Sequence, residues 1–145
     1  MRALKYWWPA IAWACVIFFL STEVFSGANT SRFIIPFLRW LLPQADAETL
    51  ARIHLVIRKA AHVANYFVFG WLVLRGVRGE ARGWSWRRSA MALLLAVAYA
   101  ALDEYHQWFV PVRGFAMRDV LLDSVGATLA QMSAYWKYRT TKFEN

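Results

Sequence analysis

The sequence predicts an all-α, polytopic membrane protein with about four transmembrane helices and one interfacial helix. Hydrophobic residues make up 59% of a 145-residue chain that carries nine Trp, six Tyr and ten Phe. A soluble domain of this length has too small an interior to bury so much apolar surface. The Lys and Arg residues fall in short blocks between apolar runs, which is typical of helices that cross a bilayer. The length indicates a single domain, residues 1–145.

The first expected span, residues 6–21, is a Trp-rich apolar run preceded by Arg2 and Lys5. Residues 26–28 are compatible with signal-peptide cleavage, so removal of residues 1–28 is the alternative. The aromatic residues at the start of the run favour a retained helix anchored at the interface. Cys15 is the only cysteine and lies within this run, so no intramolecular disulfide is expected.

The segment between the first two spans is expected to lie outside the bilayer core. Residues 26–31 have the composition of a turn. Residues 32–42 are apolar and aromatic with two arginines, which predicts an interfacial helix too short to span. Asp46 is positioned to cap a helix that begins at Ala47. That helix is expected to continue into the second span, residues 59–74.

The third and fourth spans are expected at residues 89–110 and 119–136. An arginine-rich linker, residues 75–88, precedes the third span, and Pro111, Arg113 and Gly114 indicate a turn before the fourth. At about 1.5 Å per residue, the four spans would measure roughly 24–33 Å. This length matches a bilayer core of about 30 Å.

The charge distribution predicts the orientation of the chain. Ten of the 17 Lys and Arg residues, but only two of the nine Asp and Glu residues, fall in the N-terminal segment, the 75–88 linker and the C-terminal tail. The positive-inside rule therefore places both termini in the cytoplasm. A net charge of +8 is also typical of nucleic-acid binders. Those proteins gather their basic residues on one soluble face, so no nucleic-acid partner is expected here.

In this topology, polar residues of the last three spans meet at the outer ends of the helices. The set comprises Arg58, Lys59, His62, Tyr66, Asp103, Glu104, Gln107, Arg113, Asp119 and Asp123. Lys59, His62 and Tyr66 share one helical face by their spacing. Two stripes of small residues lead to the acids: Ala92, Ala96 and Ala100 lead to Glu104, and Gly126 and Ala130 align with Asp119 and Asp123. Small residues mark the faces where membrane helices pack, so the acids are expected to point into the bundle, where charges are costly and typically functional.

These residue types suit two kinds of chemistry. Arg58, Lys59 and Arg113 suit an anionic group. His62, oriented by Asp103 or Glu104, suits acid–base catalysis, which makes these three the candidate catalytic residues. The candidate ligand-binding residues are Arg58, Lys59, Tyr66, Gln107, Arg113, Asp119 and Asp123. No metal motif with fixed spacing is present and no cofactor is expected, although a divalent cation held by His62, Asp103 and Glu104 stays open.

A structural interpretation of the same residues is the alternative. Lys59 with Asp103, or Arg113 with Asp119, can form ion pairs that tie helices together without any chemistry. Arg58 can instead extend its charged end to the lipid head groups.

The ordered residues resemble one known family. The pattern is Arg58-Lys59-x-x-His62-x-x-x-Tyr66, then Asp103-Glu104-x-x-Gln107-x-x-x-Pro111-x-Arg113, then Arg118-Asp119 with Gly126 downstream. Over about residues 10–135, it is similar to the VanZ-like family, and Ser21-Thr22 at the end of the first span also fits. Asp123 departs from the pattern, which has Asn there. The resemblance implies a bacterial cytoplasmic-membrane protein, and the family's namesake is associated with low-level resistance to the glycopeptide teicoplanin.

The leading hypothesis is therefore an outer-leaflet pocket that binds, and in its catalytic version modifies, an anionic lipid or a lipid-linked cell-envelope intermediate. The alternative is a non-catalytic membrane module that uses the same charges for recognition or for interhelical pairing. The sequence leaves open whether the chain is an enzyme, and whether it has a protein partner or forms a homo-oligomer.

Overall fold

The computed structural model describes residues 2–110, 114 and 116–140. These residues form five α-helices, one short 3-10 helix and no strand, which confirms the predicted all-α class. In chain order the elements are α1 (Arg2–Leu20), η1 (Glu23–Phe25), α2 (Gly27–Leu41), α3 (Ala47–Arg78), α4 (Trp86–Trp108) and α5 (Met117–Thr140).

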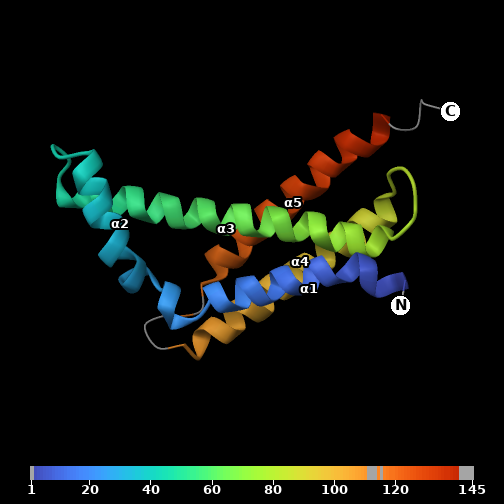
Figure 1. The fold of residues 1–145 in the computed structure, drawn as a ribbon, viewed down its shortest axis with the longest axis horizontal. Helices are drawn as coiled ribbons and strands as arrows, with labels where there is room; N and C mark the ends of the chain where they lie inside the picture. Colours follow the sequence, from blue (N-terminus) through green and yellow to red (C-terminus); the bar gives the residue numbers. More distant parts are fainter. Residues whose placement is uncertain (1, 111–113, 115, 141–145) are drawn as a thin grey trace.

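The helix α3 is the centre of the fold and contacts α1, α2, α4 and α5. Four helices (α1, α3, α4 and α5) form a bundle, and α2 packs on the N-terminal part of α3, which projects beyond the bundle (Figure 1). The N-terminus, the α3–α4 connection and the C-terminal end of α5 lie at one end of the molecule. We call it the basic end, because it carries Lys5, Arg75, Arg78, Arg82, Arg87, Arg88, Lys137 and Arg139. The segments predicted to share one side of the membrane thus share one end of the bundle.

Local signals determine where α3 begins and ends. Asp46 is its N-cap and accepts a hydrogen bond from the backbone N–H of Thr49 at 2.7 Å, which confirms the predicted start at Ala47. The same bond lowers the pKa of Asp46 and so keeps the cap charged. At the other end, Gly79 has a φ of 54°, which favours glycine and stops the helix. Because α3 continues to Arg78, the connection to α4 is residues 79–85, shorter than the predicted 75–88 linker.

The predicted turn at residues 26–31 is wrong. Gly27 begins α2, and Ser26 caps it by accepting a hydrogen bond from the N–H of Asn29 at 3.3 Å. The hydroxyls of Thr30 and Ser31 donate to carbonyls one turn back, at 2.9 and 2.7 Å. Residues that favour turns are therefore accommodated as the cap and the first turn of a helix. A helix is present where the interfacial helix was predicted, but it starts five residues earlier than residue 32.

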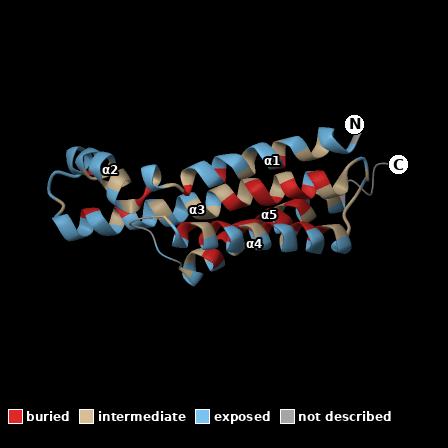
Figure 2. Ribbon diagram, turned by 90° about the horizontal axis from the view of Figure 1, so that it is seen from below, coloured by how far each residue is buried: buried red, intermediate tan, exposed pale blue. Residues whose placement is uncertain are grey.

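Small residues line the helix contacts, as the two stripes predicted. Ala92, Ala96 and Ala100 on α4 are fully buried, as are Glu104 at the end of that stripe and Ala130 on α5. Figure 2 shows the buried residues as a continuous layer between the helices. The closest approach is between α3 and α5, where a side chain added at Gly126 would overlap the carbonyl oxygen of Val63. Asp119 is only half-buried, so it does not complete the α5 stripe.

Within the described residues, one helix is long and apolar enough to cross a membrane by length and composition. The apolar stretch of this helix is Ala3–Leu20 in α1, and its mean hydropathy is 1.5. The helices α4 and α5 contain buried acids and amides such as Asp103, Asp123 and Gln131. These residues lower the mean hydropathy of the two helices.

A buried amide that the sequence did not point to ties three helices together. Gln131 on α5 accepts a hydrogen bond from the Ser89 hydroxyl of α4 at 3.1 Å and donates to the Gly70 carbonyl of α3 at 3.2 Å. Gln131→Leu would leave the Ser89 hydroxyl buried without this partner. We expect it to lower the free energy of unfolding by about 1–2 kcal/mol, measured by thermal unfolding in detergent.

The double variant Ser89→Ala/Gln131→Leu removes both polar groups and should recover part of this loss. Met132→Leu, at an exposed neighbouring position, should have no effect. An unchanged stability of Gln131→Leu would contradict the proposed role of the amide.

Candidate functional site

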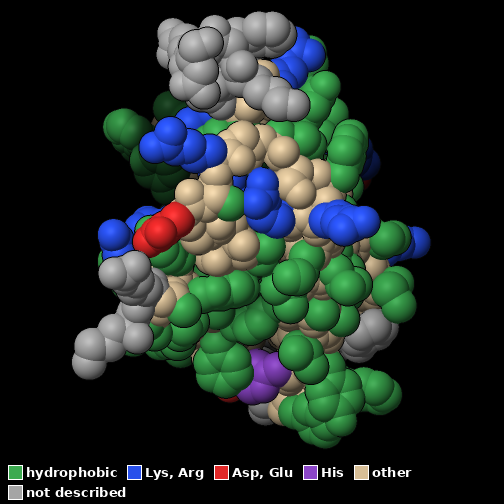
Figure 3. All heavy atoms as spheres, turned by 90° about the vertical axis from the view of Figure 1, so that its right-hand side faces the viewer, with side chains coloured by type: hydrophobic (Ala, Val, Ile, Leu, Met, Phe, Trp, Pro, Cys, Tyr) green, Lys and Arg blue, Asp and Glu red, His purple; other side chains and the backbone are tan. Residues whose placement is uncertain are grey.

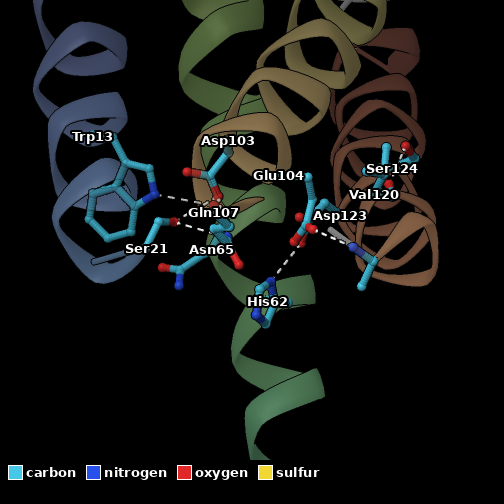
Figure 4. Close-up of polar contacts among 11 residues, drawn as sticks. Trp13, Ser21, His62, Asn65, Asp103, Glu104, Gln107, Val120, Asp123 and Ser124 are labelled. Carbon is cyan, nitrogen blue, oxygen red and sulfur yellow. Dashed lines mark hydrogen bonds and ion pairs between the residues drawn. The ribbon is translucent and has the colours of Figure 1, made fainter. Parts of the chain in front are cut away.

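Polar side chains from four helices meet at the end of the bundle opposite the basic end. Figure 4 shows them pointing toward one another from α1, α3, α4 and α5. We call this group the polar cluster: Ser21, His62, Asp103, Glu104, Gln107 and Asp123. All except His62 are buried, and His62 is about one-fifth exposed. The predicted convergence of α3, α4 and α5 is thus present in the structure, and the end of α1 joins it.

One half of the polar cluster joins α1 to α4. The Ser21 hydroxyl donates to Asp103 Oδ2 at 2.7 Å, and the Gln107 amide donates to the same oxygen at 3.1 Å. The Gln107 amide also lies 3.3 Å from Ser21 Oγ. Because Asp103 and Gln107 are four residues apart on one helix, they share a face. Ser21, which directly follows α1, completes the group from 82 residues away in sequence.

The other half joins α3 to α5. His62 Nδ1 lies 3.2 Å from Asp123 Oδ1. We expected Asp103 or Glu104 to orient His62, but the carboxylate in contact with it is that of Asp123. The reason is the close approach of α3 and α5 at Gly126, one turn along from Asp123. Asp123 is the residue that departs from the expected family pattern, so its additional carboxylate holds the histidine.

Glu104, the third acid of the polar cluster, is fully buried. Its Oε2 accepts a hydrogen bond from the backbone N–H of Ala116 at 2.9 Å, just before α5 begins. Glu104 Oε1, Asp123 Oδ2 and Tyr66 Oη are buried and have no hydrogen-bond partner among the described residues. Buried polar atoms are nearly always hydrogen-bonded in folded proteins. Three unsatisfied atoms around one cluster therefore indicate a site that a ligand or water completes.

A cavity of about 190 Å³ opens beside the polar cluster. One part of its wall is polar and includes Ser21, Arg58, His62, Asn65 and Asp103. The remaining part is mostly apolar and comes from α1, η1, α2 and α3, namely Ile17, Leu20, Phe25, Ile34, Ile57 and Ala61, with Thr30 and Tyr66. The cavity therefore presents polar and apolar surfaces to the same ligand.

The two neighbouring cations of α3 lie on different sides of the helix. Arg58 lines the cavity, and its guanidinium lies against Gly27 at the start of α2. Lys59 is exposed and lines a shallow apolar depression with Val63 and Leu122 instead. The structure thus brings Arg58, but not Lys59, to His62. Asp119 is half-buried at the start of α5, and Arg113 lies outside the described residues.

Some residues of the site were not predicted. Asn65 lines the cavity three residues after His62, and this spacing on α3 was an available signal. Thr30 Oγ1 lies 3.3 Å from His54 Nε2 and joins α2 to α3 beside the cavity. Burial lowers the pKa of His54, and the positive charge of Arg58 acts in the same direction. No spacing rule connects Thr30 to His54, because the two helices first have to pack.

The sequence model of the VanZ/LLP1 family matches residues 6–138. The chain belongs to the VanZ/LLP1 family. The match covers the bundle except for the first turn of α1 and the last two residues of α5, includes every member of the polar cluster, and confirms the resemblance that the residue pattern predicted. VanZ-like proteins are membrane proteins, and the apolar helix α1 agrees with that assignment. No curated protein and no solved structure matches this VanZ-like chain.

Three of the six residues of the polar cluster in this VanZ-like chain are carboxylic acids that could act as metal ligands: Asp103, Glu104 and Asp123. Even so, no group of three or more His, Cys, Asp or Glu side chains within the described part of the chain is arranged to hold a metal ion. The chemistry that these residues themselves offer is hydrogen bonding, anion binding by Arg58, and proton transfer at His62.

Proposed function

We propose that this chain is a polytopic protein of the bacterial cytoplasmic membrane, with both termini in the cytoplasm. Its cavity binds the head group of an anionic lipid or a lipid-linked cell-envelope intermediate in the outer leaflet. The observation that carries the proposal is the cavity beside the polar cluster, which combines Arg58 and His62 with an apolar wall.

The outward faces of the helices support several membrane spans. Large apolar side chains are exposed on α4 and α5, whereas three of the four acids of those helices, Asp103, Glu104 and Asp123, are buried. The exposed residues away from the helix ends are Met91, Leu94, Leu95, Leu102, Tyr105, Leu121, Val125, Leu129 and Met132. At about 1.5 Å per residue, α4 and α5 are roughly 35 Å long, enough to cross a core of about 30 Å. A helix with apolar residues outside and polar residues inside suits lipid better than water.

The anionic character of the ligand follows from Arg58. Its guanidinium lies against the first turn of α2, where unpaired N–H groups add positive potential. A phosphate or carboxylate at this point would accept two charge-assisted hydrogen bonds from the guanidinium, in a bidentate arrangement. The apolar wall then favours an amphiphile over a free inorganic anion.

The volume limits the size of the bound group. The cavity of about 190 Å³ corresponds to roughly six water molecules. It accommodates a phosphate-containing head group, with the hydrocarbon chains left in the bilayer, but not a whole glycopeptide antibiotic. In this proposal, a contribution to teicoplanin resistance comes from a change in the envelope.

A proton-transfer step at the bound head group is the catalytic version of this proposal. His62 uses Nδ1 toward Asp123, which leaves Nε2 as an acceptor for a proton from a hydroxyl or a water molecule. In this version Asp123→Asn, nearly isosteric, abolishes the cellular phenotype, while lipid retention persists and stability falls by only about 1 kcal/mol. A parallel, graded loss of phenotype and retention would instead indicate a non-catalytic binding module.

A structural role is the second candidate, favoured by the hydrogen bonds within the polar cluster. Ser21, Asp103 and Gln107 join α1 to α4, and His62 and Asp123 join α3 to α5. If these bonds serve only to hold helices together, substitutions will lower thermal stability and leave lipid retention proportional to the folded fraction.

The binding proposal is tested by native mass spectrometry of the purified protein with its co-purified lipids. Arg58→Gln and Lys59→Gln each remove one positive charge from adjacent positions of α3. We expect Arg58→Gln to weaken retention of an anionic lipid about tenfold, which corresponds to about 1.4 kcal/mol, and Lys59→Gln to leave it unchanged. Equal losses in both variants would show that only the local net charge matters, and would refute a site at the cavity.

Gly27→Ala provides an independent variant for the same test. A Cβ at residue 27 would displace the Arg58 guanidinium, a flexible group that can move at little steric cost. Retention should therefore fall while thermal stability stays at the wild-type level.

A further inference from the structure

A second cavity lies at the basic end, at the far end of α3 from the polar cluster. Its volume is about 260 Å³, and its wall comes from α1, the end of α3 and the end of α5. The side chains that define it are Tyr6, Trp71, Arg75, Arg78, Lys137 and Tyr138. We call it the basic cavity.

Three cations, Arg75, Arg78 and Lys137, line the basic cavity. Among the described residues, Glu80 is the one acid at this end, and it accepts a hydrogen bond from the Tyr6 hydroxyl at 3.3 Å. Arg82, Arg87 and Arg88 lie nearby in the α3–α4 region. Figure 3 shows Lys and Arg side chains spread over this end face with little acidic surface between them. The potential in the cavity is therefore positive and attracts anions.

Arg78 is held in place before any ligand arrives. Its guanidinium carbon lies 3.6 Å from the centre of the Tyr138 ring, and Nη2 donates to the Ala81 carbonyl at 3.1 Å. Its Nε is buried without a hydrogen-bond partner among the described residues. A guanidinium fixed by a ring and a carbonyl, with donors left over, loses little entropy when it binds an oxyanion.

In the membrane-spanning arrangement proposed above, aromatic rings put the basic cavity at the level of the lipid head groups. Lys137 Nζ lies 5.3 Å from the centre of the Trp71 ring, and Arg139 lies 3.6 Å from that of Trp136. Trp and Tyr beside Lys and Arg are typical of a membrane–water interface. Basic pockets between transmembrane helices on the cytoplasmic side are suited to phosphate-bearing head groups.

From this geometry we infer that the basic cavity binds the phosphate group of an anionic phospholipid from the inner leaflet. Arg75 and Arg78 contact the phosphate oxygens, and Trp71 and Tyr138 pack on the glycerol and upper chains. The inference rests on the membrane-spanning arrangement proposed above, but not on any ligand at the polar cluster. The chain would then hold one anionic lipid at each end.

The test is native mass spectrometry of the detergent-purified full chain with phosphatidylglycerol or phosphatidylcholine added. Arg75 is exposed, so Arg75→Gln should fold normally. We expect wild type to bind two molecules of phosphatidylglycerol in preference to phosphatidylcholine. Arg75→Gln and Arg78→Gln should each weaken one of them about tenfold. Arg87→Gln, an exposed cation of the same end outside the cavity, should weaken neither.

Two comparisons separate this inference from the proposed function. Arg58→Gln should lose the other lipid, so that Arg58→Gln/Arg75→Gln loses both. If Arg75→Gln lowers the retention of phosphatidylglycerol but Arg58→Gln does not, the proposed outer site is refuted and the proposed lipid site in the basic cavity is still supported. Equal losses in Arg75→Gln and Arg87→Gln would refute the basic cavity. Displacement of phosphatidylglycerol by millimolar inorganic phosphate would also overturn it as a lipid site.

Discussion

Replacing Gly126 by valine is expected to destabilise the bundle by about 3 kcal/mol. A Cβ at residue 126 would overlap the carbonyl oxygen of Val63 and lie 3.1 Å from the backbone nitrogen of Phe67. Both are backbone atoms of α3, so neither can rotate away and the two helices must separate. The measurement is thermal unfolding in detergent, where a loss of this size would lower Tm by roughly 6–12 °C.

Gly114→Ala is the matched control. No described atom lies within 4 Å of a Cβ at that position, so stability should not change. Gly70→Ala tests the same interface from α3, since its Cβ would lie 2.9 Å from that of Ala130 and 3.1 Å from the Cα of Ala127. It should be destabilised less than Gly126→Val, because one of these contacts is to a side chain. Wild-type stability of Gly126→Val would show that α3 and α5 do not pack as closely as described.

Removing His62 is expected to cost more than neutralising its partner. In His62→Ala, the Asp123 carboxylate stays fully buried without the imidazole. An uncompensated buried charge destabilises a fold by about 3 kcal/mol or more. In Asp123→Asn, the histidine keeps a neutral hydrogen-bond partner, and the expected cost is about 1 kcal/mol. Thermal unfolding of both variants in the same detergent measures the difference.

A double variant completes this test. His62→Ala/Asp123→Asn has no charge left at residue 123, so it should be more stable than His62→Ala alone. The coupling between the two sites, obtained from the double-mutant cycle, should exceed about 1 kcal/mol. Simple additivity of the two single effects would show that the 3.2 Å contact does not contribute to the stability of the α3–α5 interface.

The local features of the fold were predictable because they depend on nearby residues. The cap at Asp46 and the start of α3 at Ala47 follow from one hydrogen bond over three residues. The burial of Ala92, Ala96, Ala100 and Glu104 follows from a four-residue period on one helix. The start of α2 was misplaced because serine, threonine and asparagine favour both turns and helix caps. Their composition alone does not distinguish the two.

The pairing within the polar cluster was not predictable in the same way. Asp103, Glu104 and Asp123 are all acids near His62 in the expected topology, and spacing does not rank them. Which acid contacts His62 depends on the close approach of α3 and α5 at Gly126. This approach brings Asp123 within 3.2 Å of His62, although the two residues are 61 positions apart in sequence. The close packing at Gly70 and the Gln131 bridge depend on the same packing of helices.

The sequence by itself determined the all-α class, the family, the concentration of basic residues at one end and five of the six residues of the polar cluster, all except Ser21. Only the tertiary structure decided that Arg58 and not Lys59 faces the cavity, that Asp123 holds His62, and that a second cavity forms around Arg78. Propensity, capping and periodicity act within one or two turns of a helix. The rotation of each helix about its axis is set instead by packing between helices, and neighbouring residues differ by about 100° in direction.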